Sequence, residues 1–221
     1  CHAPDVRNNE YFAGLDFIKR MDGCCGWADV AVLLPWRLYE IYRDVTILEN
    51  FYPMMKAHIK FQISRTNKTG FCAKPVFGED KKYISNVGQA FGEWLEPPDV
   101  YKQSVLNDFL APHSEEATAY LSFTCGIMAE IARLVGHDED IPLYEEYNSG
   151  CKKAYNNRFV RGGEIDTDRQ SKLVRPLAFN LLDGAVKTNV LNRLIESIIK
   201  REYKIGTGFL STPLILPTLT K

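Results

Sequence analysis

The chain has 221 residues, of which 45% are hydrophobic and 25% charged, and its 27 Lys and Arg against 28 Asp and Glu give a formal net charge of −1. This composition is typical of a folded globular protein and excludes an intrinsically disordered chain. The near-zero charge disfavours nucleic acid as a partner, because phosphate binding needs a surplus of cations. No apolar run reaches the roughly 18–20 residues of a membrane span, so we expect no membrane partner either.

The cysteines and the first residues bear on the cellular compartment. No pair forms a C-x-x-C motif and no Cys/His spacing is zinc-like, so we expect no metal, no cofactor and a reducing, cytoplasmic location. Cys1 stands where a start Met is expected, without a preceding leader pattern, and we expect the sequence to begin inside a longer protein. The six cysteines are Cys1, Cys24, Cys25, Cys72, Cys125 and Cys151.

Helical signals in the first third of the chain predict two helices across a short link. Asp29 is the expected N-cap of the first helix, which runs to about residue 41. Thr46-Ile47-Leu48-Glu49 has the pattern of a capping box and predicts a second helix over residues 46–65.

The second half of the chain predicts further helices. Ser114 and two acids predict a helix start, and Gly136 its end, before a helix that ends near residue 159. Thr167 to Gln170 form a second expected capping box, opening a helix that ends at residues 183–184, and an apolar stripe predicts a helix over 185–203. A last short helix begins at Thr212.

Short links make consecutive helices antiparallel neighbours, so we expect an all-α fold of helical hairpins over residues 29–65, 114–159 and 168–203. Two long loops, 1–28 and 66–113, interrupt the pattern within what we expect to be a single domain, 1–221. Connections of that length in a compact domain are often functional.

Each loop carries a tryptophan near an acid: Trp27 precedes Asp29, and Glu93 precedes Trp94. Two interpretations stay open for each pair. In the first pair, Asp29 caps the helix and Trp27 packs beside it, or Trp27 forms an aromatic wall of a binding site. Likewise Trp94 either anchors its loop while Glu93 is solvated, or the pair binds sugar by ring stacking and hydroxyl hydrogen bonds.

Several segments together resemble one family, the bacterial α-L-rhamnosidases. Residues 26–39, G-W-A-D-V-A-V-L-L-P-W-R-L-Y, are similar to the family stretch G-W-G-D-A-A-V-…-P-W-x-L-Y. Residues 91–95, F-G-E-W-L, resemble F-G-D-W-L, and residues 207–217 resemble T-G-F-L-G-T-P-x-L-L-P. Residues 117–120 match the start of a following helix. The segments occur in the family's order and cover nearly the whole chain.

The resemblance implies part of an (α/α)6 barrel of helical hairpins and an inverting glycoside hydrolase, in which one carboxyl protonates the leaving oxygen and another activates water. It implies that Trp27 and Trp94 line a rhamnose subsite, where an apolar wall suits the methyl group of a 6-deoxy sugar. Glu93 and Asp29 join them as expected substrate-binding residues, with a structural role first for Asp29. The implied partner is a rhamnose-containing glycoside.

This sequence also departs from the family pattern. Ala28 replaces a glycine, Glu93 replaces an aspartate, and residues 66–90 look longer than typical. The family's general acid motif is expected before Cys1 and its general base motif after Lys221, so we expect no catalytic residue in this chain and no hydrolysis by it alone. We also expect a homodimer through helices whose apolar surface is unpaired. Two alternatives stay open: another six-hairpin glycosidase, or a non-catalytic helical module that binds carbohydrate or protein.

Overall fold

A computed structural model describes residues 23–69, 73–88, 91–100 and 113–220 of the chain. Among these residues there is no strand, only two isolated antiparallel bridges, Thr66 to Ser85 and Arg161 to Glu164. The all-α prediction is therefore confirmed. The helices are α1 (Val30–Tyr42), α2 (Thr46–Ser64), α4 (Ser114–Val135), α5 (Ile141–Phe159), α6 (Gln170–Ala178), α7 (Gly184–Lys200) and α8 (Thr212–Leu219), with 3₁₀ turns η4 (Glu79–Tyr83) and η5 (Asp138–Asp140).

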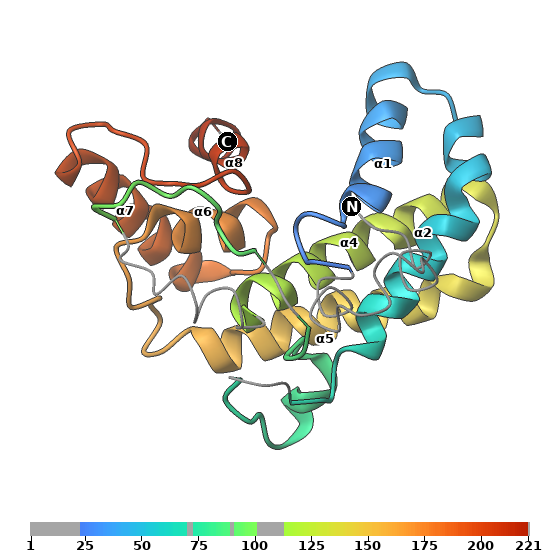
Figure 1. Cartoon of the computed structure of the whole chain (residues 1–221), viewed down its shortest axis with the longest axis horizontal. Coiled ribbons are helices and arrows are strands. Elements are labelled where there is room, and N and C mark those ends of the chain that lie inside the picture. Colours follow the sequence, from blue (N-terminus) through green and yellow to red (C-terminus); the bar gives the residue numbers. More distant parts are fainter. Residues whose placement is uncertain (1–22, 70–72, 89–90, 101–112, 221) are drawn as a thin grey trace, which may run out of the picture.

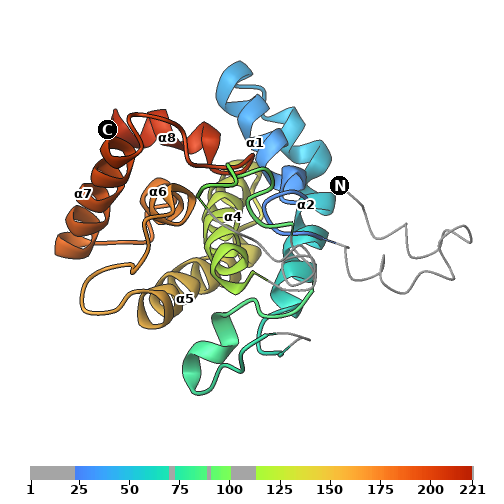
Figure 2. The same cartoon turned by 60° about the vertical axis from the view of Figure 1, so that its left-hand side comes forward.

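The helices pair in chain order into three hairpins, α1 with α2, α4 with α5, and α6 with α7 (Figure 1). The α4/α5 hairpin is central: α4 packs against α2 on one side and against α6 on the other, as the turned view also shows (Figure 2). Helix α8 packs on α6. The three expected hairpins, and with them part of an (α/α) array, are present.

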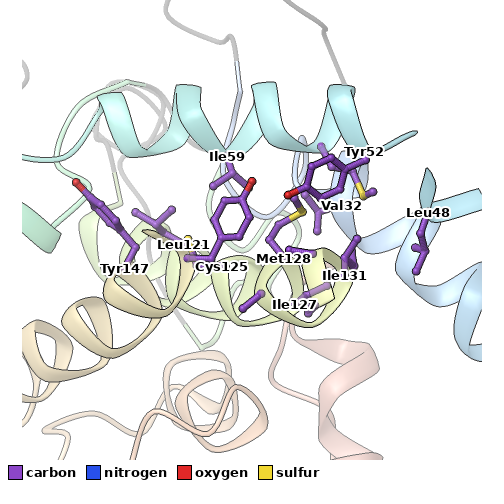
Figure 3. Packing of buried hydrophobic residues seen from close by; sticks show 14 of the residues in the cluster. Val32, Leu48, Tyr52, Ile59, Leu121, Cys125, Ile127, Met128, Ile131 and Tyr147 are labelled. Carbon is purple, nitrogen blue, oxygen red and sulfur yellow. The ribbon is translucent and has the colours of Figure 1, made fainter. Parts of the chain in front are cut away.

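Two apolar clusters hold the hairpins together. In the first, Tyr52 and Ile59 of α2 face Met128 and Ile131 of α4, and all four side chains are buried (Figure 3). In the second, α4, α5, α6, α7 and α8 share a cluster that includes Leu173 and Leu194. Each fully buried aliphatic side chain contributes roughly 1.5–3 kcal/mol, so α4, which joins both clusters, is the main support of the fold.

At three of the expected N-terminal caps, Asp29, Thr46 and Thr167, the side chain makes no capping hydrogen bond because it bonds to another group. Asp29 is the N-cap residue of α1, as expected, but its carboxylate accepts from the Gly26 amide at 2.7 Å instead of capping the helix. Thr46 is the first residue of α2, and its amide donates to Asp44 Oδ1 at 3.0 Å. Thr167 accepts from the Arg169 amide at 3.1 Å, and α6 begins only at Gln170.

Helix α6 is also shorter than expected at its other end. It ends at Ala178 because Asn180 adopts the left-handed conformation with φ 57°, after which Leu181 donates back to the Pro176 carbonyl at 2.9 Å. The Asp183-Gly184 pair, expected to end this helix, instead begins α7. By contrast Gly136 ends α4 as predicted, with φ 76° and its amide bonded to Ala132.

None of the described helices is both long and apolar enough to cross a membrane. Within the second long loop, η4 packs against α5. Cys1, Cys72 and residues 1–22 of the first expected loop lie outside the described residues.

Candidate functional site

Four aromatic side chains from three separate segments meet at one surface, which we call the aromatic face: Trp27, Phe91, Trp94 and Phe209. The Trp27 ring lies edge-on to Phe91 at 5.9 Å and to Phe209 at 6.0 Å between centroids, and Phe91 lies 5.7 Å from Trp94. Trp94 is 48% exposed and Phe209 59% exposed. Trp27 and Trp94 thus share one side of the hairpin array, although 67 positions separate them, and the face is open to solvent.

Backbone contacts fix these segments against one another. The Phe209 amide donates to the Trp94 carbonyl at 3.0 Å, and Trp27 Nε1 donates to the Gly92 carbonyl at 3.4 Å. Only glycine fits at position 208, because a Cβ there would stand 2.5 Å from the Trp94 carbonyl oxygen. Gly92, with φ 60°, supplies the left-handed turn that brings residues 91 and 94 onto the same face.

Beneath the aromatic face lies a buried group of charges, the Arg175 cluster: Arg175, Glu93, Glu115 and Glu116. Arg175 of α6 is 1% exposed, and its Nη2 lies 2.6 Å from Glu93 Oε1 and 3.2 Å from Glu116 Oε2. Its Nη1 lies 2.6 Å from Glu115 Oε2. Charge-assisted hydrogen bonds of this length are about twice as strong as neutral ones, so one guanidinium ties α6 to the start of α4 and to the loop of Trp94.

Glu93 is neither solvated nor open to the surface. Its carboxylate is buried and accepts from Arg175, from the Ser211 amide at 3.2 Å and from the Ser211 hydroxyl. It therefore holds the 91–95 loop against the 208–211 turn, and it is Trp94, next to it, that reaches solvent.

Asp29 is buried at the base of the same face. Its Oδ2 accepts from the Gly26 amide and its Oδ1 lies 2.8 Å from His58 Nε2 of α2. These contacts orient the turn that carries Trp27. Direct binding of a sugar by Trp27, Asp29, Glu93 and Trp94 stays a prediction.

Nucleophilic or metal chemistry has little support in the described part of the chain. Burial raises the pKa of the Cys24 thiol to about 12, and its Sγ accepts from the Phe91 amide at 3.1 Å. One oxygen or nitrogen from each of His137, Glu139 and Asp140 could in principle surround a cation. Asp140, however, already accepts from the Tyr52 hydroxyl at 2.8 Å and from Lys56 at 2.6 Å.

With this geometry in view, the family profile of the bacterial alpha-L-rhamnosidase 6 hairpin glycosidase domain matches residues 3–221. The chain belongs to this family. An alpha-L-rhamnosidase of Formosa agariphila is 31% identical over 97% of this chain and 22% of its own length.

Solved structures agree with the fold. An alpha-L-rhamnosidase of Streptomyces avermitilis, crystallised with L-rhamnose, is 26% identical over 90% of this chain and 17% of its own, with a TM-score of 0.70. The alpha-L-rhamnosidase of Aspergillus terreus, at 24% identity and a TM-score of 0.67 over 88% of this chain and 21% of its own, supports the fold alone. The chain spans about a fifth of the length of the relatives it matches.

Sequence reasoning missed several residues of this site. Arg175 and His58 each lie inside a predicted helix with no motif around them. Glu115 and Glu116 are the two acids of a predicted helix start, which explains them locally. Phe209 lies within the 207–217 motif, so the motif identified its segment without predicting that its ring would complete the aromatic face.

Proposed function

We propose that this chain is the part of a glycoside hydrolase that receives terminal α-L-rhamnose, within a protein that releases this sugar from rhamnose-containing glycosides. The observation that carries the proposal is the aromatic face, which the three motif segments build together from positions far apart in the sequence. Membership of the α-L-rhamnosidase domain family supports it.

The apolar character of the face fits the sugar. Aromatic rings offer a large apolar surface with little conformational freedom to lose on binding. Rhamnose carries a methyl group at C6 where hexoses carry a hydroxymethyl group, so a sugar with a C6 hydroxyl leaves that hydroxyl without a partner against an aromatic ring. Such a desolvated hydroxyl costs free energy, and discrimination against L-mannose, which differs from L-rhamnose only there, follows.

The tryptophan indole N–H signals give a direct test, because the chain has only three tryptophans, Trp27, Trp36 and Trp94. Titration with L-rhamnose should shift the signals of Trp27 and Trp94 in a ¹H–¹⁵N spectrum, while Trp36 of α1 serves as the internal control. L-mannose should cause smaller shifts at the same concentration. Equal shifts for both sugars would favour a different sugar specificity, and shifts of Trp36 alone would contradict the proposal.

We further propose that the chain does not hydrolyse rhamnosides by itself and works by supplying the binding wall for an inverting acid and base located elsewhere. The carboxyls that lie near the aromatic face, Asp29, Glu93 and Glu116, are 2–3% exposed and already hold structural partners. Proton transfer by a positioned group contributes about 10²–10⁴-fold. Incubation of the chain with an aryl α-L-rhamnoside should release no aglycone above buffer, and robust release would refute this part.

A further inference from the structure

The Arg175 cluster does not balance its charges. One guanidinium faces the carboxyls of Glu93, Glu115 and Glu116, and each of the four side chains is at most 15% exposed. With all three carboxylates ionised, one positive charge would face three negative charges in a site with little water. Uncompensated buried charge is costly, and carboxyl groups that crowd together relieve it when one of them holds a proton.

The contacts identify which carboxyl holds the proton. Glu93 accepts from Arg175 and twice from Ser211, and Glu115 accepts from Arg175 and from the Tyr155 hydroxyl at 2.8 Å. Glu116 has the longest contact with the guanidinium, 3.2 Å against 2.6 Å for the others. Its other hydrogen bond among the described residues comes from the Cys25 thiol, at 3.7 Å. Of the three carboxyls, Glu116 therefore has the weakest hydrogen bonds to stabilise a negative charge.

Burial and the neighbouring carboxylates also favour the protonated form of Glu116. Burial raises the pKa of Glu116 to about 8, the positive charge of Arg175 opposes this, and the negative charges of Glu93 and Glu115 add to it. The titratable groups around the cluster come from every element packed on it: Arg175 and Lys172 from α6, Glu115 and Tyr120 from α4, Tyr155 from α5, Glu93 from the 91–95 loop, and Cys24, Cys25 and Asp29 from the turn before α1.

We propose that Arg175 is a positioning residue for the aromatic face and that Glu116 beside it is protonated and neutral. The guanidinium then forms ion pairs with Glu93 and Glu115 alone. The segment that Glu93 anchors carries Trp94, and its partner Ser211 ends the turn that carries Phe209. Loss of the Glu116 proton to solvent would set a third negative charge against Glu93 and loosen both segments. An effect of this loosening on sugar binding rests on the proposed function.

A pH titration without any sugar tests the proposal. In the chain, the indole N–H signals of Trp27 and Trp94 should shift between pH 7 and 9 with a midpoint near 8. In Glu116→Gln, whose side chain imitates the neutral acid, both signals should keep their pH 7 positions throughout. The matched control Glu130→Gln, an exposed α4 residue paired with Arg133, should titrate as the unmodified chain does.

A conservative change of the guanidinium provides the second arm. Arg175→Lys keeps the charge but replaces the planar fork, whose two nitrogens reach Glu115 and Glu93 separately, by a single nitrogen on a shorter side chain. The Trp94 indole signal should therefore move at pH 7, whereas the exposed control Arg133→Lys should leave it in place. Absence of a titration near pH 8, or the same titration in Glu116→Gln, overturns the neutral Glu116. An unmoved Trp94 signal in Arg175→Lys overturns the positioning role, and neither result affects the rhamnose titration, which tests the function separately.

Discussion

Replacement of Arg175 by methionine tests whether the buried ion cluster supports the fold. Methionine has a similar length and keeps the packing of the aliphatic stem, but it leaves the carboxylates of Glu93 and Glu115 without a cation. Removal of one partner from a buried ion pair costs about 3–5 kcal/mol, because the remaining charge stays uncompensated. Glu93, at 2% side-chain exposure, has little access to water, whereas Glu115, at 15%, regains some hydration. We therefore expect a loss of about 3–5 kcal/mol in the free energy of unfolding.

The assay is urea or thermal unfolding followed by circular dichroism at pH 7. For a chain of this size, a loss of 3–5 kcal/mol lowers the melting temperature by roughly 6–20 °C. Arg133→Met is the matched control, since Arg133 of α4 also pairs with two glutamates, Glu130 and Glu145, but is 39% exposed. Exposed pairs contribute about 0–1 kcal/mol. Equal losses in the two variants would refute the reasoning.

Three further predictions concern Glu116, the 208–211 turn and helix α7. The pKa of Glu116 is raised in the folded chain from 4.5 to about 8, so folding favours its protonated form. As pH rises between these values, the free energy of unfolding should fall by about 1.4 kcal/mol per pH unit relative to that of Glu116→Gln. Above pH 8 the difference between the two chains in urea unfolding should stay constant. Gly208→Ala should push the 208–211 turn off the Trp94 carbonyl and red-shift tryptophan fluorescence; an unchanged emission maximum would contradict the close approach. Ile195 and Ile199 of α7 are 40% and 53% exposed, so the chain should self-associate in sedimentation velocity and Ile199→Lys should weaken this, whereas a monomer at high concentration would refute the dimer.

Helical periodicity was enough to predict the hairpins. Of the two glycine stops, Gly136 ends α4 as expected, whereas Gly184 begins α7. The apolar spacing of α2 and α4 matches the burial of Leu48, Met55, Met128 and Ile131, but Met54 and Leu134, expected on the same faces, are each 44% exposed. The capping hydrogen bonds did not form because other groups compete for the same side chains. Asp29 bonds to His58, 29 positions away, which no local motif can indicate, and Thr46 donates to Asp44, two residues before it.

The Arg175 cluster lay beyond sequence reasoning for a different reason. Glu115 and Glu116 are common at the positive end of a helix, and their local explanation was sufficient. Their actual partner, Arg175 of α6, lies 60 positions from Glu115, 59 from Glu116 and 82 from Glu93. Such contacts arise only when the α4/α5 and α6/α7 hairpins pack together with the 91–95 loop, so the sequence could indicate an acid beside Trp94 but not that it is buried.

The most direct test of the central claim is saturation-transfer NMR on L-rhamnose in the presence of the 221-residue chain, with the protein resonances irradiated. If the aromatic face receives the sugar, the C6 methyl protons should gain the largest saturation, and Trp27→Ala and Trp94→Ala should each remove most of it while Trp36→Phe does not. Absence of transfer to the methyl protons, or transfer that survives both alanine substitutions, would contradict the assignment of this face to rhamnose.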